Sequence, residues 1–380
     1  MIFKRGDTYY SEFEIRGRRY RESTNQTNPR VARQMEAARR TGVLKGEVGI
    51  RDKEQAPRFA DYADNWIETY VTAHCKHSTL RSYEGVLEKH LKPAFSGKLL
   101  DEITRQDISD LINKKLASTS ARGKATTRGT VRNILAPLRE MLNHAVDAGI
   151  LVANPANRAG RYMKEKKAAK TNRMKIDPLT REESQTLLAT AEKFGHGTHA
   201  VMLTALRTGL RMGELFGLQW GDLDFNSRFV EVRRSIVQGR IETPKSGQLR
   251  RVDMSLQLTA TLKELSRRRK EEYLQKGEPM PEWVFINTDG TPLDQHNFRK
   301  RVYLGLLAKA GLRQIRFHDL RHSFASLLLQ QGESLTYVKE QMGHHSIQVT
   351  VDIYGHLIPG SNKQAVDRLD YAPVATTATA

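Results

Sequence analysis

Segment 164–175, with the sequence KEKKAAKTNRMK, restricts the possible folds of this chain more than any other feature. It holds six basic residues and one acidic residue, and it has almost nothing apolar to bury. This composition predicts an exposed linker rather than part of a hydrophobic core. A length of 380 residues suits two or three domains. We therefore expect separate folded units on the two sides of a basic linker.

The positive charge is concentrated in the N-terminal half of the chain. Lys and Arg number 62 and Asp and Glu 43, which gives a formal net charge of +19. Residues 1–175 hold 35 basic and 20 acidic residues, whereas residues 176–380 hold 27 and 23. This asymmetry favours a nucleic-acid-binding half beside a more ordinary domain. A generic basic protein kept soluble by charge repulsion is the less favoured alternative.

Several protein classes are disfavoured by composition. Cys75 is the single cysteine, which excludes an internal disulfide and a multi-cysteine metal site and suits a reducing cytosol. No apolar run approaches the ~20 residues of a membrane span. The start, MIFKRGDTYYSEFEIRG, lacks the apolar core of a secretory signal. We expect a soluble cytoplasmic protein with no membrane partner.

Residues 1–50 are predicted to form a small β+α module. Side chains over 9–15 alternate with a period of two, which indicates a strand, and 18–23 would return as a second strand. Asn28 followed by Pro29 predicts a helix that reaches about residue 40. Arginines near the hairpin either contact DNA phosphates, which we favour, or form a solvated face. They are Arg16, Arg18, Arg19 and Arg21.

Residues 57–163 are predicted to form an all-helical unit. Apolar residues recur at helical spacing in four stripes, over 59–71, 80–91, 108–116 and 131–145. Thr104 and Asp107 form a capping box before the third stripe, Pro137 predicts a kink in the fourth, and Gly149 predicts its end. These stripes are core positions.

Basic side chains of this unit and of the linker are predicted to follow a DNA backbone. They are Lys114, Lys115, Arg122, Lys124, Arg128 and Arg132 in the helical unit, and Lys164, Lys166, Lys167 and Lys170 in the linker.

Residues 176–371 are predicted to form an α+β domain, followed by a frayed tail over 372–380. A capping box of Thr180 with Glu183 restarts folded structure after the linker. Helices then alternate with short strands over 229–237, 240–243 and 250–254, which we expect to form one small antiparallel sheet. The predicted fold class is a mainly helical, multidomain protein.

Four stretches of this domain concentrate reactive side chains. Arg211 and Glu214 lie in TGLRMGELFGLQWGDLDF, Lys245 in ETPKSGQLRRVDM, His318 and Arg321 in RFHDLRHSFASLLL, and His344 and Tyr354 in QMGHHSIQVTVDIYGH. Each has a structural interpretation of its own: an ion pair, a solvated hairpin lysine, a surface His–Arg pair and a core tyrosine. A zinc site is the weaker interpretation of the histidines, because no His-Glu-x-x-His motif and no nearby cysteine is present.

Taken together, the residue types suit phosphoryl transfer. Two arginines can neutralise the charge that develops on phosphate oxygens in the transition state. A tyrosine can attack phosphorus if a neighbour takes its proton, and a lysine or histidine can protonate the departing sugar oxygen. Such a site needs neither a metal nor ATP, because its cations are built in and a phosphotyrosyl ester keeps the energy of the broken bond. We expect no cofactor.

The order of these motifs resembles the tyrosine recombinase (phage integrase) family over roughly residues 176–360. The matching features are Arg in TGLRMGEL, Lys in a predicted β-hairpin, His-x-x-Arg in HDLRHSFAS, Gly-His, and a terminal Tyr-x-His. One such motif would be weak support, whereas all five in order are highly specific. The helical unit resembles the family's core-type DNA-binding domain, and the N-terminal module resembles the arm-binding domain of phage-type integrases.

The resemblance implies how the phosphate is held and attacked. Arg211 and Arg321 would bind the non-bridging oxygens of the scissile phosphate. Lys245 would be the general acid that protonates the 5′-hydroxyl leaving group. Tyr354 would attack phosphorus and form a 3′-phosphotyrosyl link, which the 5′-hydroxyl of a partner strand later displaces.

The resemblance also implies supporting roles and an assembly. His318 would assist proton transfer from the tyrosine, His344 would hydrogen-bond the phosphate, and Glu214 would orient the site. The family works as a homotetramer on two DNA duplexes and passes through a Holliday junction while it integrates or excises a phage or mobile element. Implied partners are double-stranded attachment-site DNA and accessory DNA-bending or directionality proteins. The implied location is the bacterial cytoplasm or nucleoid.

Three other functions are less favoured. A type IB topoisomerase-like enzyme shares the nucleophile, but the N-terminal module argues for assembly on a long site. A catalytically silent DNA-binding regulator conflicts with the intact motif set. A metal-dependent nuclease predicts activity that is lost in chelator.

The spacing between the last two motifs predicts a break in the chain. His344, assigned by its place after a glycine although His345 follows it, precedes Tyr354 by ten positions. This is about 15 Å along a continuous helix, too far for both to contact one phosphate. We therefore predict a break around Ile347–Val349 and a separate helix for Tyr354. His356 is expected to be structural.

Overall fold

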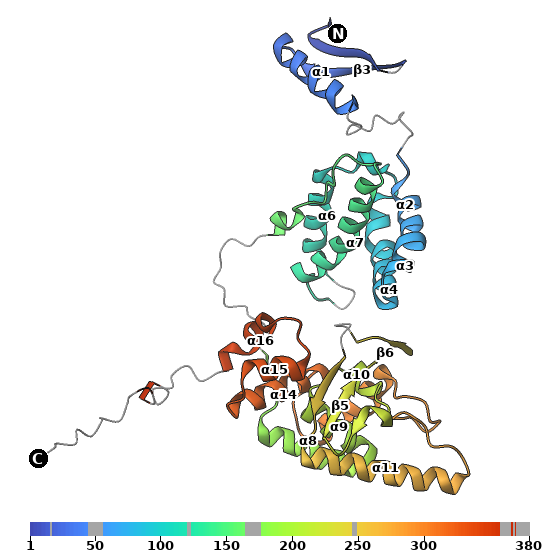
Figure 1. The fold of residues 1–380 in the computed structure, drawn as a ribbon, viewed down its shortest axis with the longest axis vertical. Helices are drawn as coiled ribbons and strands as arrows, with labels where there is room; N and C mark the ends of the chain where they lie inside the picture. The colour runs from blue at the N-terminus through green and yellow to red at the C-terminus, as the bar shows by residue number, and fades with distance from the viewer. Residues whose placement is uncertain are drawn as a thin grey trace, which may run out of the picture. The chain divides into compact units, whose positions relative to one another are not determined.

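The structure is a computed structural model. It describes residues 1–15, 17–44, 56–119, 123–163, 176–244 and 249–357, together with Val366, Asp367 and Leu369. The chain divides into two compact units, 1–168 and 169–380, whose elements are drawn in Figure 1. The fold class is confirmed as mainly helical with small antiparallel sheets. Among the described residues, none of the helices has both the length and the apolar content needed to span a membrane.

The N-terminal module is a three-stranded antiparallel sheet with one helix packed on it. Strands β1 (Ile2–Arg5), β2 (Thr8–Ile15) and β3 (Arg18–Gln26) pair in sequence order, and α1 (Pro29–Leu44) contacts β2 and β3. The predicted helix start at Pro29 is confirmed. Phe13 and Ala32 are buried between sheet and helix, so this module has only a small core.

The helical unit consists of α-helices, two of which continue through π-helical turns, together with short 3-10 turns. The α-helices are α2 (Phe59–Trp66), α3 (Thr72–His74), α4 (His77–Val86), α5 (Lys92–Phe95), α6 (Arg105–Ala117) and α7 (Arg128–Asp147). The π-helical turns η1 (Ile67–Val71) and η2 (Leu87–Leu91) join α2 to α3 and α4 to α5, and the 3-10 turns are η3 (Leu100–Glu102) and η4 (Ala159–Met163). All four predicted stripes supply buried side chains to one core. The Thr104–Asp107 capping box is confirmed.

The C-terminal unit packs helices around two small sheets. Its longer helices are α8 (Arg181–Lys193), α9 (His196–Thr208), α11 (Leu256–Lys276), α14 (Phe317–Gln330), α15 (Leu335–Met342) and α16 (Ile347–Tyr354). Shorter helical segments are α10 (Met212–Phe216), η5 (Trp220–Asp222), α12 (Gln295–Asn297), η6 (Phe298–Tyr303), α13 (Leu304–Lys309) and η7 (Gly355–Leu357). The Thr180–Glu183 capping box that opens α8 is confirmed.

The predicted single sheet was wrong in its topology. Strands β4 (Leu223–Asp224), β5 (Phe229–Val232) and β8 (Arg250–Asp253) form one sheet, whereas β6 (Ser235–Val237) and β7 (Arg240–Glu242) form another. The expected strand over 229–237 is interrupted at Arg233 and Arg234. Arg234 donates to the buried carboxylate of Asp222 at 2.6 Å, and this ion pair lies where the chain leaves the first sheet.

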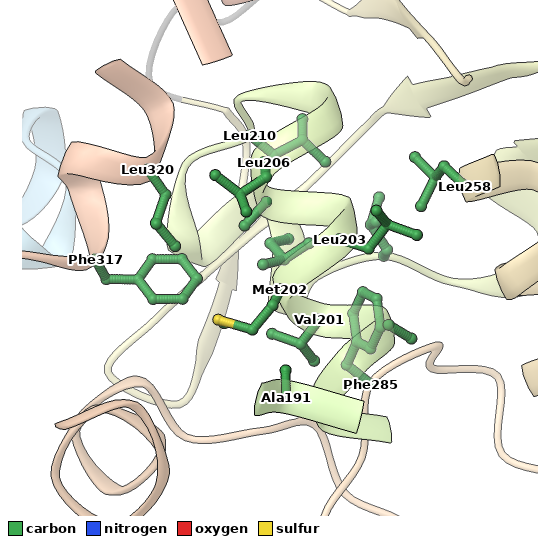
Figure 2. Close-up of a cluster of buried hydrophobic side chains, with 14 of the residues drawn as sticks. Ala191, Val201, Met202, Leu203, Leu206, Leu210, Leu258, Phe285, Phe317 and Leu320 are labelled. Carbon is green, nitrogen blue, oxygen red and sulfur yellow. The ribbon is translucent and has the colours of Figure 1, made fainter. Parts of the chain in front are cut away.

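Helix α9 is the centre of the main core of this unit. Figure 2 shows its side chains Met202, Leu203 and Leu206 surrounded by apolar residues from other elements, including Phe285 and Phe317. Residues 200–206 of this helix are all buried. A helix that is enclosed on nearly all sides is fixed in position, and its C-terminal end leads directly into the segment with Arg211.

A second, smaller core holds α14, α15 and α16 together. Its buried members include Phe324, Val338, Met342 and Tyr354. The prediction that Tyr354 lies on a helix separate from His344 is confirmed. The predicted position of the break was wrong by a few residues: α15 ends at Met342 with Gly343 as its C-cap, and Ser346 caps α16 through its side chain. The break falls earlier because glycine adopts the left-handed turn that ends a helix.

Candidate active site

One guanidinium connects the segments that carry the site residues. Arg321 lies on α14 and is only 3% exposed. It donates to the backbone carbonyl of Gly209 at 2.5 Å and to that of Met342. These carbonyls come two residues before Arg211 and two residues before His344. Arg321 therefore brings together segments that lie 112 and 21 positions away along the chain.

Two glycines turn the chain at these contacts. Gly209 ends α9 with φ of +58°, and Gly343 ends α15 with φ of +62°. A Cβ at Gly209 would overlap the ring of Phe324, and a Cβ at Gly343 would lie 2.7 Å from Cδ of Arg250. Both positions therefore require glycine, for conformation and for space.

A buried carboxylate fixes the first arginine. Glu214 is 1% exposed and accepts hydrogen bonds from the Arg211 guanidinium at 2.8 Å and from the Arg211 backbone N–H at 3.0 Å. Arg250 donates to both carboxylate oxygens, at 3.1 and 2.6 Å. Although burial opposes ionisation, these arginines lower the pKa of Glu214 to about 2. The carboxylate therefore stays charged and orients both cations.

The tyrosine at the end of α16 is completely enclosed. The side chain of Tyr354 is 0% exposed, and its hydroxyl lies 2.7 Å from Nδ1 of His322. The His344 ring is parallel to the phenol within 10°, with ring centroids 6.5 Å apart, and its Nδ1 lies 2.9 Å from Oγ1 of Thr350. Burial raises the pKa of Tyr354, and the charge of Arg321 only partly opposes this effect. The phenol is therefore neutral in this structure.

The histidines are held in their neutral forms. Partial burial, together with His322, Arg321 and Arg211, lowers the pKa of His318 to about 4. Burial, Arg321 and Arg211 likewise lower the pKa of His344 to about 4. Neutral imidazoles can exchange protons with a reacting group at neutral pH. Within the described ranges, no three His, Cys, Asp or Glu side chains are grouped so that they could hold a metal ion.

The site has more positive than negative charge. Burial and the charges of Arg211 and Arg250 lower the pKa of Arg321 to about 9, which still leaves it protonated at neutral pH, and Glu214 is the carboxylate that opposes this effect. Asp319, the other nearby acid, is paired with Arg316. Cations that depress one another's pKa in a partly buried site favour an anionic ligand.

Lys245 lies outside the described residues. The predicted hairpin around it was wrong, because β7 pairs with β6 whereas β8 pairs with β5. Segment 243–249 therefore joins two different sheets. His345 is exposed, and its ring is not among the contacts of Tyr354.

Comparison with known proteins identifies the family. Residues 178–359 match the phage integrase family, and residues 58–116 match the N-terminal SAM-like domain of phage integrases. The chain belongs to the tyrosine recombinase (phage integrase) family. It is therefore a tyrosine-type site-specific recombinase, and the matched segments include the first part of the helical unit and all the described site residues.

Two relatives of this family align with most of the chain. A XerC-like tyrosine recombinase from Caldanaerobacter subterraneus subsp. tengcongensis is 29% identical over 342 residues, which cover 85% of each protein. The ICEBs1 integrase of Bacillus subtilis is 28% identical over 358 residues, which cover 90% of this chain and 93% of the relative.

Solved structures show the same fold at low sequence identity. The Tn1549 transposon integrase, in complex with a circular intermediate DNA, is 18% identical with a TM-score of 0.64, covering 82% of this chain and 98% of its own. The lambda integrase tetramer bound to a Holliday junction is 17% identical with a TM-score of 0.56. The match covers 91% of this chain and 95% of the lambda integrase chain.

Sequence reasoning missed three residues of this recombinase site. Arg250 clamps Glu214, His322 contacts the Tyr354 hydroxyl, and Thr350 contacts His344. His322 lies next to Arg321 in the same motif, but a histidine there gives no sign of its partner 32 positions away. The one indirect signal for Arg250 comes from Glu214, because a carboxylate that becomes buried needs a cationic partner.

The structure describes only part of the predicted DNA-contact set. Arg19 pairs with Glu12, Arg21 stacks over the ring of Phe3, and Lys115 lies 3.1 Å from Nδ1 of His90. Lys114, Lys124 and Arg132 are exposed, and Arg128 is half-buried at the start of α7. Outside the described residues lie Arg16, Arg122, Lys164, Lys166, Lys167 and Lys170, as do the side chains of Arg18 and His356.

Proposed function

We propose that this recombinase cleaves and rejoins DNA strands with Tyr354 as its nucleophile. The observation that carries the assignment is the double contact of Arg321 with the carbonyls of Gly209 and Met342. Those hydrogen bonds hold the segments that carry Arg211 and His344 against α14. The resulting group of cations and neutral imidazoles suits a phosphodiester.

The proposed cleavage step conserves atoms and charge. The Tyr354 oxygen forms a bond to phosphorus while the bond from phosphorus to the 5′-oxygen breaks, leaving a 3′-phosphotyrosyl link. The phenol proton passes to a neutral base, for which His318 is the proposed group, and Lys245 donates a proton to the 5′-oxygen. Resealing reverses each transfer when a 5′-hydroxyl of the partner strand attacks.

Arg211 and Arg321 would stabilise the transition state electrostatically. Each has a fixed guanidinium, one held by Glu214 and the other by backbone carbonyls. Donors that are already oriented need no reorganisation when charge develops on the non-bridging oxygens. His344, held by Thr350, would donate a further hydrogen bond to the phosphate. Glu214 would act through Arg211 and Arg250 and not on the substrate.

The proposed partner is double-stranded attachment-site DNA. The Tn1549 and lambda integrase structures were both solved in complex with DNA, and the lambda integrase structure is a tetramer bound to a Holliday junction. We propose the same kind of assembly, a homotetramer on two duplexes that exchanges one pair of strands at a time. The basic N-terminal half would contact phosphates, and segment 1–50 would bind arm-type sites. Accessory DNA-bending or directionality proteins and a bacterial cytoplasmic location are part of this proposal.

Plasmid relaxation tests the nucleophile without knowledge of the target site. Wild-type protein and Tyr354→Phe are incubated with supercoiled plasmid in chelator, without ATP, and quenched with detergent. We expect relaxation and protein-linked DNA with wild type and neither with the variant, while DNA binding persists in both. Cleavage by Tyr354→Phe would exclude Tyr354 as the nucleophile, and nicking that appears only with a divalent metal would favour a nuclease.

A synthetic core site supplies the test if plasmid alone gives no signal. Binding-site selection identifies the cognate sequence, and a nicked version of it traps the covalent intermediate. A topoisomerase-like enzyme would relax this DNA without forming Holliday junctions, whereas a recombinase forms them. A regulator would bind the site and form no adduct under any condition.

A further inference from the structure

The hydroxyl of Thr350 makes a contact that differs from those of other buried helical threonines. Thr350 lies on α16 and is 0% exposed, and its Oγ1 lies 2.9 Å from Nδ1 of His344. The buried threonines of α9, Thr204 and Thr208, instead donate to the backbone carbonyl four residues earlier, at 2.7 and 2.6 Å. Thr350 makes no such bond to Ser346 within the described residues of α16. The imidazole of His344 therefore replaces the backbone carbonyl as its partner.

Burial determines the direction of this hydrogen bond. A hydroxyl shut off from water needs an acceptor, because an unsatisfied buried donor is costly. The Thr350 hydroxyl has no other hydrogen-bond partner among the described residues, so its O–H donates to His344. Nδ1 of this ring is then the unprotonated nitrogen. Burial and the charge of Arg321 lower the pKa of His344 to about 4, so the ring is neutral and its single proton lies on Nε2.

The protonated nitrogen is the one that is free to bind a ligand. Nε2 of His344 has no hydrogen-bond partner within the described ranges. The half-buried ring lies in the field of Arg321 and Arg211, the two cations proposed to bind the scissile phosphate. An N–H at this position would add a donor to an anion held by those cations, whereas a lone pair would repel the anion. The tautomer of His344 therefore determines whether this residue stabilises a bound phosphate.

We infer that Thr350 is a positioning residue that fixes His344 in its Nε2–H tautomer and so presents a hydrogen-bond donor to the scissile phosphate. The inference rests on the proposed role of His344 and deepens it. Thr350 acts through the imidazole and not on the substrate, and no covalent bond changes. Without the hydroxyl the ring would populate both tautomers. Cleavage should then slow about fivefold, the equivalent of one net hydrogen bond.

Nitrogen-15 NMR of the full-length, DNA-free protein labelled at histidine tests the tautomer directly. The two nitrogens of a neutral imidazole resonate at different positions according to which one carries the proton, and His344→Gln identifies the signals. We expect a protonated Nε2 and an unprotonated Nδ1 in wild type and in Thr350→Ser. In Thr350→Val the two resonances should move towards each other, because the tautomers then interconvert.

Two NMR results would overturn the inference. One is a wild-type His344 ring that is protonated on Nδ1, and the other is unchanged resonances in a folded Thr350→Val. Since the first needs only the wild-type spectrum, the test does not depend on the folding of the variant.

Single-turnover cleavage measures the consequence for the reaction. On a nicked half-site, Thr350→Val should form the covalent adduct about fivefold more slowly than wild type at unchanged DNA affinity. Thr350→Ser, which keeps the hydroxyl, should retain the wild-type rate. Thr204→Val is the matched control, because Thr204 is equally buried in the same unit but donates to a carbonyl of its own helix. Equal slowing in Thr204→Val or in Thr350→Ser would contradict a role through the His344 tautomer.

A double-mutant cycle separates this role from a general effect on structure. In a His344→Ala background, Thr350→Val should not change the adduct rate further, because no imidazole remains to be oriented. Further slowing in that background would overturn the inference, as would a wild-type rate in His344→Ala alone. The proposed nucleophile fails separately: adduct that persists in Tyr354→Phe would refute Tyr354 and leave the NMR result intact.

Discussion

Replacing Glu214 by glutamine tests whether a buried carboxylate organises the recombinase site. The substitution keeps the side-chain shape and removes the negative charge that Arg211 and Arg250 share. Both cations would then be left in a partly buried site without a counter-charge. Removing one partner of a buried ion pair is costly because the remaining charge is uncompensated.

The magnitude follows from the pKa of this carboxyl group. It falls from 4.5 to about 2 in the folded protein. Since one pKa unit corresponds to ~1.36 kcal/mol, ionised Glu214 stabilises the fold by about 3 kcal/mol. A carboxyl whose pKa is lowered by folding stabilises the protein above its unfolded pKa. Glu214→Gln should therefore lose about 3 kcal/mol at pH 7, and its difference from wild type should shrink as pH falls from 4.5 towards 2.

Urea unfolding followed by tryptophan fluorescence measures this loss, because two of the three tryptophans, Trp220 and Trp283, lie in the C-terminal unit. Glu264→Gln is the matched control. Glu264 also has a pKa lowered to about 2 by two arginines, but on the exposed surface of α11, where solvent screens ion pairs. We expect no measurable change there. Equal losses in the two variants, or no loss in Glu214→Gln, would refute the reasoning.

Further outcomes follow from the same geometry. Gly343→Ala should destabilise the protein by about 1–3 kcal/mol through backbone strain at positive φ, and the overlap of the new Cβ with Arg250 should add to this loss. Gly311 also has a positive φ but has open space around it, so Gly311→Ala should show the strain alone. Equal urea unfolding midpoints for the two variants would contradict the overlap. Because His318 and His344 have lowered pKa values of about 4, stability should fall as pH drops from about 6.5 towards 4; a flat profile would contradict these lowered pKa values. Deleting residues 1–50 should leave core-site cleavage and impair integration, so unchanged integration would refute the arm-binding role. DNA affinity should fall steeply with salt as counterions are released, and a flat salt titration would contradict phosphate contacts by the basic half.

Predictions that depend on neighbouring residues were confirmed by the structure. The capping boxes at Thr104 and Thr180 involve partners three positions away, and helix-spaced apolar stripes need only the local period of the chain. The break between His344 and Tyr354 followed from distance arithmetic alone. Its exact position did not, because it depends on the left-handed conformation of Gly343.

Strand pairing could not be derived in the same way. Residues 229–237 read as one continuous strand, yet β5 and β6 belong to different sheets. The interruption coincides with the ion pair between Arg234 and the buried Asp222, which lies 12 positions earlier. No local pattern encodes which carboxylate an arginine will meet, so the sequence did not reveal this exchange of sheets.

The sequence by itself determined the identity and order of the reactive groups, since Arg211, Arg321, His344 and Tyr354 occur in motifs whose residue types already suit phosphoryl transfer. Tertiary structure decided how those groups are held. The bonds of Arg321 to two carbonyls, the clamp of Arg250 on Glu214 and the contact of His322 with Tyr354 span 21 to 112 positions. Such contacts arise only when separate helices pack, because burial then forces each polar group to find a partner wherever the fold places one.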